Sequence, residues 1–179
     1  QRAMIERVIA GIDVPDNGIW EIRGQARWFT HSRVMMWAAL DRGVRAVRQH
    51  GLPGDADRWA TARDRLREEI DRRGVHPERG HFVQHYDTDE VDASLLVLPQ
   101  VGYCQADDPR MLRTVEEMER TLMRDDLLLR YRTRTGVDGL PGDEHPFLAC
   151  SFWLVEQHAA SGRRADAEAL MGRLVSFVN

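Results

Sequence analysis

Apolar residues recur along most of the chain at steps of three and four positions, the spacing that places them on one face of an α-helix. The clearest run covers about 30–49, where the apolar face is broad. Thr30 stands where an N-cap would begin this helix, and the stretch 51–54 ends it with two glycines and a proline. The next run continues to Arg73, with Asp55 as its expected cap. The pattern therefore predicts two long consecutive helices.

Three further regions extend the helical pattern. The segment 91–101 holds a nearly continuous apolar stretch, which predicts a helix buried on most sides and leaves a strand as the weaker alternative. A charged helix is expected to begin with Pro109 at its first position and to reach about Met123. Residues 146–160 are again very apolar, whereas 164–178 alternates charged and aliphatic side chains. Helices are thus expected throughout the chain.

Buried and amphipathic helices alternate in this pattern. The helix at 30–49 and the two strongly apolar segments are each followed, after a short connection, by a helix with a strong polar face. An inner layer of buried helices inside an outer layer of amphipathic ones predicts an all-α toroid, in which the loops before the inner helices converge on one mouth. A plain helical bundle or an α-solenoid would show much of the same periodicity.

Composition narrows the classes of protein. The 179 residues are 42% hydrophobic and 30% charged, which suits one globular domain, and a net charge of -4 without a basic stripe argues against nucleic acid as a partner. Cys104 and Cys150 lie far apart and indicate neither a zinc site nor a disulfide. No apolar run approaches the roughly 20 residues that span a membrane, and no signal peptide is visible. We expect a cytoplasmic protein without membrane contact.

Both ends of the sequence lie inside or directly after apolar helical patterns. Gln1 precedes an amphipathic run, and Asn179 directly follows another. We therefore expect 1–179 to be a single partial domain, cut from something longer at both ends.

Two connections before expected inner helices, 13–29 and 124–147, are rich in aromatic and charged side chains. Long loops of this kind are where a rigid scaffold carries a functional site. In the first loop Glu21 is flanked by Trp20 and two isoleucines, which would desolvate a carboxylic acid and raise its pKa toward the range that suits a proton donor. Spacing alone leaves a simpler interpretation, a core tryptophan beside an exposed glutamate.

Sugar rings are bound through aromatic faces and through charged groups that pair with hydroxyls. Side chains of these kinds are Trp20, Trp28, Tyr131, Arg23 and Arg130. His31 begins an expected inner helix, where it could bind substrate or simply hydrogen-bond within the mouth, and both interpretations stay open.

Several motifs follow one another in a characteristic order. The first is P-D-N-G-I-W-E-I-R-G at 15–24, and the second is F-T-H-S-R-V-M-M-W-A-A-L-D-R at 29–42. Later motifs are F-V-Q at 82–84, D-A-S-L-L at 92–96, R-Y at 130–131, and D-G-L at 138–140 running on to F-L-A-C-S-F-W-L at 147–154. Together they extend over nearly the whole chain and resemble family 15 of the glycoside hydrolases, the family of glucoamylases and bacterial trehalases.

The resemblance implies a partial (α/α)6 toroid of the six-hairpin glycosidase type and inverting hydrolysis of α-glucosidic bonds with release of β-glucose. It implies that Glu21 is the general acid, that Trp20 lines the sugar subsite and that Arg130 binds hydroxyls of the non-reducing glucose. Three further residues, Tyr131, Glu144 and Phe147, fall in the neighbouring substrate loop. No cofactor and no metal are implied.

Inverting hydrolysis needs a second carboxylate, roughly 6.5–9.5 Å from the acid, to activate water. The resemblance places this general base in a glutamate-rich motif after a helix like 164–178, and no segment here resembles that motif. Glu156 and Glu168 lie on expected helices and are poor substitutes. We therefore expect negligible hydrolysis by this chain alone, and association between copies through apolar surface that an open toroid exposes.

Other polar residues suggest weaker hypotheses. The loosely spaced histidines at 76, 81 and 85 do not indicate a metal site. Asp89 and Glu90 are expected to cap the following helix, and Asp92 to lie near the mouth. The pairs Met35-Met36 and Phe152-Trp153 are expected in the core, because helical spacing places them among apolar side chains.

The substrate is expected to be trehalose, maltose or a malto-oligosaccharide. Trehalose is preferred because 29–42 looks most like the bacterial trehalase branch of the family. A rival function is a non-catalytic carbohydrate-binding or regulatory module on the same toroid, since a fold alone does not settle function.

Overall fold

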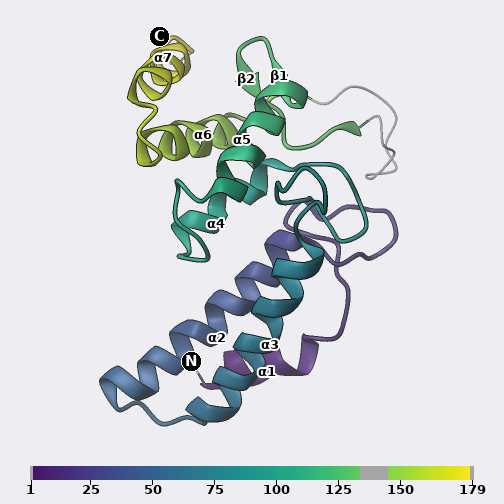
Figure 1. The fold of residues 1–179 in the computed structure, drawn as a ribbon, viewed down its shortest axis with the longest axis vertical. Helices are drawn as coiled ribbons and strands as arrows, with labels where there is room; N and C mark the ends of the chain where they lie inside the picture. Colours follow the sequence, from purple (N-terminus) through teal and green to yellow (C-terminus); the bar gives the residue numbers. More distant parts are fainter. Residues whose placement is uncertain (1, 134–144, 178–179) are drawn as a thin grey trace.

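The computed structural model describes residues 2–133 and 145–177 and is mostly helical (Figure 1). Its longer helices are α1 (Arg2–Gly11), α2 (Thr30–His50), α3 (Ala56–Arg73), α5 (Pro109–Thr121), α6 (Leu148–Ala160) and α7 (Arg164–Val175). The 3-10 helix η1 (Ala93–Leu96) leads into the single turn α4 (Val97–Gln100). Two short strands, β1 (Met123–Arg124) and β2 (Leu127–Leu128), pair antiparallel. The all-α class is therefore confirmed.

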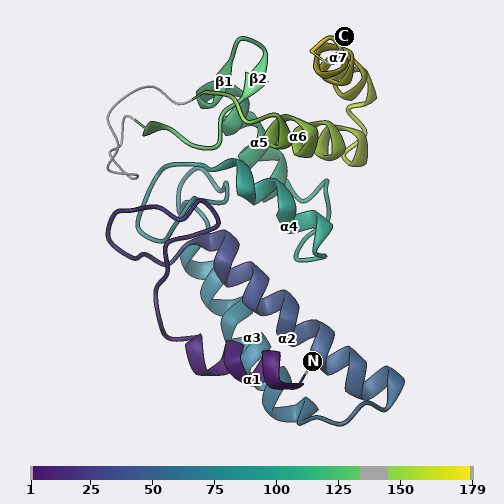
Figure 2. The same ribbon diagram turned by 180° about the vertical axis from the view of Figure 1, so that it is seen from behind.

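Helices α2 and α3 form a hairpin and lie side by side in both views (Figures 1 and 2). Gly51 ends α2 in the left-handed conformation, with φ of 63°, and its N–H donates to backbone carbonyls of the last turn. Asp55 caps α3 by accepting a hydrogen bond of 3.1 Å from the N–H of Arg58. Local turn and cap chemistry thus produces the two helices that the sequence predicts.

Two local predictions were wrong. Phe29, not Thr30, is the N-cap residue of α2, and Thr30 lies inside the helix, where its hydroxyl oxygen is buried without a hydrogen-bond partner among the described residues. The stretch 91–101 forms η1 and one α-turn instead of a single helix. Pro99 has no N–H with which to continue an α-helical ladder, and Gly102 with φ of 78° then reverses the chain.

The β1–β2 ribbon was not predicted from the sequence. Asp125 and Asp126 connect the strands with φ values of 51° and 62°, as a tight hairpin turn requires. The strands are two residues long, too short to show an alternating pattern, while Leu127 and Leu128 are buried. The ribbon leads toward the chain segment that carries Arg130.

One hydrophobic cluster runs from Ile5 in α1 to Leu154 in α6 and includes Trp59, whose side chain is 2% exposed. Met36 and Trp153 pack against it from partly buried positions. Met35 and Phe152 are 41% and 44% exposed, so their assignment to the core was wrong. Adjacent residues on a helix point about 100° apart, so a pair at the edge of an apolar face places one member outside it.

Within the described residues, the structure contains no helix both long enough and apolar enough to cross a membrane.

Candidate active site

The loop 16–27 is closed on itself by hydrogen bonds. Asp16 and Arg27 exchange two backbone hydrogen bonds of 3.0 and 2.8 Å. The Asp16 carboxylate accepts from the N–H of Gly18 at 2.7 Å, and the Asn17 amide donates to the carbonyl of Ile22 at 2.6 Å. Gly18 has φ of 68°, which a residue without Cβ adopts at little cost. The residues between 18 and 22 are therefore held in one conformation.

Successive residues of this loop point in different directions. Ile22 is 2% exposed and packs with Phe29 and Tyr131. Trp20 is half-buried against the same cluster, whereas Glu21 is exposed and has a left-handed φ of 51°. The apolar shielding of Glu21 that the sequence led us to expect does not come from Ile22, because that side chain is directed into the interior.

Glu21 lies on the wall of an open cavity of about 510 Å³. The described residues that line this cavity come from the 16–27 loop, from the segment after β2 and from the residues before α6: Ile19, Trp20, Glu21, Arg130, His145, Pro146 and Phe147. Segments far apart in the sequence therefore meet around one carboxylate.

Trp20 is the centre of an aromatic cluster on this wall. Its ring centroid lies 6.5 Å from that of Tyr131, 6.3 Å from that of Phe147 in an edge-on arrangement, and 6.1 Å from that of Trp153. The guanidinium carbon of Arg130 lies 5.6 Å from the Trp20 centroid and 5.4 Å from the Tyr131 centroid, within cation–π range. A cationic donor and aromatic surfaces thus lie on the same wall as Glu21.

The indole of Trp20 is also hydrogen-bonded to a buried carboxylate. Its N–H donates a hydrogen bond of 2.8 Å to the Asp92 carboxylate, which is 1% exposed. Burial raises the pKa of Asp92, and hydrogen bonds from Ser94, Gln84 and Trp20 oppose that effect. Asp92 was expected near the mouth, and it reaches the site through Trp20.

The chain matches a known protein family over most of its length. The family described as glycosyl hydrolases family 15 matches residues 1–172. The chain belongs to this family. A trehalase of Mycobacterium tuberculosis is 39% identical over 178 residues, which are 99% of this chain and 26% of that protein. A trehalase of Thermoplasma acidophilum is 35% identical over 180 residues, with 98% of this chain and 30% of that protein covered. The chain therefore spans less than a third of either relative.

Solved structures show the same fold at lower sequence identity. A glycosidase variant in complex with glucose superimposes with a TM-score of 0.77 at 20% identity, covering 91% of this chain and 42% of that one. A wild-type glycosidase gives a TM-score of 0.75 at 19% identity, with the same coverage. The partial six-hairpin toroid that the sequence predicts is thereby confirmed.

Several residues that were predicted to bind substrate in this family 15 chain lie away from the cavity. Arg23 is exposed on the loop but does not line it. Trp28 packs beneath the guanidinium of Arg33, whose carbon is 4.9 Å from the ring centroid. His31 lines a neighbouring groove together with Asp16. Burial lowers the pKa of His31, and the charge of Asp16 opposes this. Glu144 lies outside the described residues.

The cavity is also lined by residues that were not predicted to bind substrate. Ile19, His145 and Pro146 line it, and Trp153 packs behind Trp20. His145 and Pro146 directly precede the motif at 147–154, so their place in the chain was a usable signal. Trp153 had only a helical apolar pattern, which does not distinguish a core tryptophan from one beneath a site.

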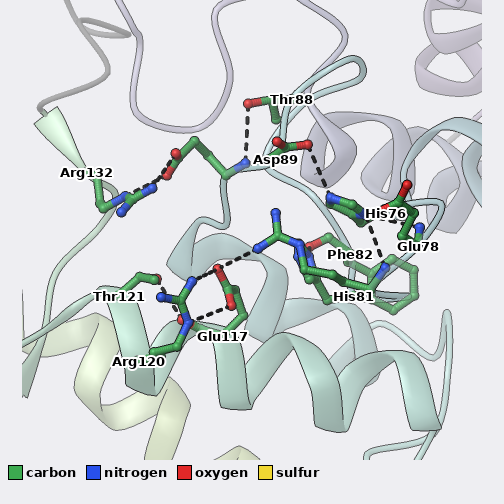
Figure 3. A network of polar contacts seen from close by, with 12 residues as sticks. His76, Glu78, His81, Phe82, Thr88, Asp89, Glu117, Arg120, Thr121 and Arg132 are labelled. Atoms are coloured by element: carbon green, nitrogen blue, oxygen red, sulfur yellow. Dashed lines mark hydrogen bonds and ion pairs between the residues drawn. The ribbon is translucent and has the colours of Figure 1, made fainter.

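The histidine region forms a separate polar network (Figure 3). The Nε2 atom of His76 lies 3.2 Å from an Asp89 oxygen, and the rings of His76 and His81 lie 5.1 Å apart. His85 faces Phe29 instead, with ring centroids 5.7 Å apart. The expected capping by Asp89 and Glu90 was wrong, because Asp89 pairs with His76 and Glu90 with Arg132, while Asp92 caps η1.

Proposed function

We propose that this chain contributes the proton-donating part of an active site that hydrolyses α-glucosides with inversion. The observation that carries the proposal is the position of Glu21 on a cavity wall beside Trp20, Phe147 and Arg130. In this proposal Glu21 protonates the oxygen of the scissile glucosidic bond as the bond to the sugar breaks. Membership of family 15 supports a glycoside hydrolase and leaves the stereochemistry to be tested.

The neighbouring side chains suit a glucose ring. Trp20 and Phe147 offer apolar rings to the C–H surfaces of the sugar, and the Arg130 guanidinium can donate several hydrogen bonds to hydroxyl oxygens. Tyr131 is 4% exposed, so we propose that it supports the Trp20 ring and does not itself contact sugar. Arg23 and Glu144 remain proposed contacts for the distal part of a substrate.

Trehalose is the proposed substrate. The curated relatives in Mycobacterium and Thermoplasma are trehalases, which favours trehalose over the malto-oligosaccharides that a glucoamylase would use. Trehalose and the malto-oligosaccharides share a non-reducing glucose and differ in the leaving group. The proposed wall of Trp20 and Arg130 recognises the shared part.

A second carboxylate is needed on the opposite face of the sugar, roughly 6.5–9.5 Å from the acid. Among the described residues that line the cavity, Glu21 is the one that carries a carboxylate. We propose that the general base lies outside this chain in the complete protein, and that the 179 residues alone hydrolyse little. A binding module without catalysis is the second candidate, favoured by the exposure of Glu21 on this open wall.

The test supplies the full-length protein with trehalose, maltose and isomaltose and follows the fresh product by proton NMR. The expected result is hydrolysis, fastest for trehalose, in which the first glucose released by water attack appears as the β-anomer before mutarotation. Trehalose releases its second glucose, the leaving group, as the α-anomer, so initial α-glucose without an equal amount of β-glucose from trehalose would contradict inversion. Binding of trehalose without any hydrolysis would favour the module over the enzyme.

A further inference from the structure

A buried carboxylate stands behind the cavity wall without lining it. The side chain of Asp92 is 1% exposed, and both of its oxygens accept hydrogen bonds. Oδ1 accepts from the N–H of Ser94 at 2.6 Å, while Oδ2 accepts from the Trp20 indole at 2.8 Å and from the Gln84 amide at 3.2 Å. One oxygen is enough to cap η1, so the two hydrogen bonds that Oδ2 accepts are not part of the helix cap.

The second oxygen connects segments that build the site. Trp20 belongs to the 16–27 loop, and the carbonyl of Gln84 accepts from the N–H of Thr30, the first residue of α2. The backbone N–H of Ala93 donates a hydrogen bond of 2.8 Å to the carbonyl of Arg130. Asp92 and Ala93 therefore fasten both Trp20 and Arg130, two residues on the cavity wall, to one short stretch of chain.

The Trp20 ring needs such an attachment. The ring is half-buried and packs against three aromatic rings whose centroids lie 6.1–6.5 Å from its own, and such apolar contacts are less directional than a hydrogen bond. The hydrogen bond from the indole N–H to Asp92 is directional, so it favours one orientation of the ring. Rotation of the indole would move both the aromatic surface and the site over which the Arg130 guanidinium lies.

We propose that Asp92 is a positioning residue that fixes the Trp20 indole, and with it Arg130, in the orientation that binds the sugar ring. The inference rests on the proposed function, because it assigns Trp20 and Arg130 to the glucose. It adds a residue that touches no substrate and acts through the indole N–H.

The test is a double-mutant cycle in the full-length protein. Asp92→Ser keeps an oxygen that can cap η1 but is too short to reach the indole. Trp20→Phe keeps an aromatic ring and removes the N–H. We expect Asp92→Ser to lower kcat/KM for trehalose about tenfold or more in the parent, chiefly through KM, and by less than about twofold in the Trp20→Phe protein.

The matched control is Asp41→Ser, which also removes a buried carboxylate. Asp41 is 5% exposed and pairs with Arg45 and Arg63 on the α2–α3 hairpin, away from the cavity. This variant should unfold at lower temperature while its kcat and KM stay as in the parent. A purely structural role for Asp92 would make both aspartate variants behave alike.

A second measurement does not depend on activity. In protein labelled with ¹⁵N at the indoles, the Trp20 N–H resonance is assigned by its absence from Trp20→Phe, and Asp92→Ser should move it upfield. An unmoved resonance, or equal losses of kcat/KM in the two backgrounds, would overturn the inference. A parent protein that hydrolyses no α-glucoside while the resonance moves would refute the proposed function and retain the Asp92–Trp20 contact.

Discussion

Glu21 illustrates how the conformation of one residue separates the roles of its neighbours. Its φ of 51° lies in the left-handed region, which costs a residue with a side chain about 1–3 kcal/mol. The hydrogen bonds of Asp16 and Asn17 maintain this conformation. As a result Trp20 packs into the aromatic wall and Ile22 into the interior, while Glu21 stays at the cavity.

His81 gives a prediction about acid stability. Its ring is 2% exposed, and burial lowers its pKa, with Arg79 and His76 adding to the effect and the Phe82 carbonyl and Glu117 opposing it (Figure 3). Below about pH 6.5 the unfolded chain takes up a proton that the folded chain resists. The free energy of unfolding therefore decreases as the pH is lowered below about 6.5. For this group the decrease is at most about 1.4 kcal/mol per pH unit, and it ends once the pH is below the pKa of the folded state.

His81→Asn removes this titration and can keep a donor to the Phe82 carbonyl, which His81 contacts at 2.9 Å. We expect the free energy of unfolding of the variant, relative to the parent, to rise as the pH falls from 7.5 to 5, as measured by denaturant titration. His50→Asn, at the exposed end of α2, controls for loss of an imidazole. A relative free energy that is flat across this range would contradict the role of burial.

Residue order along the chain predicted part of the site. The motifs that hold Trp20, Glu21, Arg130 and Phe147 are far apart in the sequence, and the fold places all four on one cavity. Trp28 is a tryptophan in the same loop as Trp20 and was also predicted to bind sugar, yet it packs against Arg33. The hydrogen bond between Trp20 and Asp92 joins residues 72 positions apart, and no local pattern contains such a pairing.

At the scale of elements, local signals predicted the long helices well. The α2–α3 hairpin follows from apolar spacing, from Gly51 in the turn and from the Asp55 cap. The secondary structure of 91–101 was harder to predict, because a continuous apolar run indicates that a segment is buried and does not indicate how long its helix is. Asp92 caps η1, and Pro99 in the following α4 has no N–H with which to continue a longer α-helical ladder.

Close packing at the α2–α3 turn gives a prediction for this element. A Cβ added at Gly54 would lie 2.6 Å from Cζ3 of Trp59 and 2.9 Å from Cγ2 of Val47. The Trp59 ring is 2% exposed and its N–H donates to Glu6, so it has little room to move. We expect Gly54→Ala to lower the free energy of unfolding by about 1–3 kcal/mol, measured by denaturant titration.

Gly11→Ala is the matched comparison. Gly11 ends α1, and a Cβ there would meet nothing within 4 Å. Alanine also restricts the unfolded chain, so this variant should be as stable as the parent or more stable by up to about 1 kcal/mol. Equal destabilisation by both substitutions would show that the contact with Trp59 does not decide the outcome.

At the scale of the whole molecule, helices α6 and α7 carry exposed apolar surface. Exposed hydrophobic side chains lie on or beside α6 and α7: Phe147, Leu148, Phe152, Met171, Val175 and Phe177. The chain covers 26% of the Mycobacterium tuberculosis trehalase, and in a complete toroid other helices would cover part of such a surface. Association between copies of the isolated chain stays a prediction, as does its status as one partial domain.

We propose that Glu21 donates a proton to the leaving oxygen. A substrate whose leaving group needs no proton separates this role from binding, because general acid catalysis then contributes little. The direct measurement is kcat/KM of the full-length protein and of its Glu21→Gln variant for trehalose and for α-glucosyl fluoride. Glu168→Gln, an exposed carboxylate on α7, is the matched control.

We predict that Glu21→Gln lowers kcat/KM for trehalose by about 100-fold or more and that for α-glucosyl fluoride by less than about tenfold, while Glu168→Gln changes neither. Equal losses on both substrates would indicate a role in binding or folding. Unchanged hydrolysis of trehalose by the Glu21→Gln variant would contradict the assignment of Glu21 as the general acid.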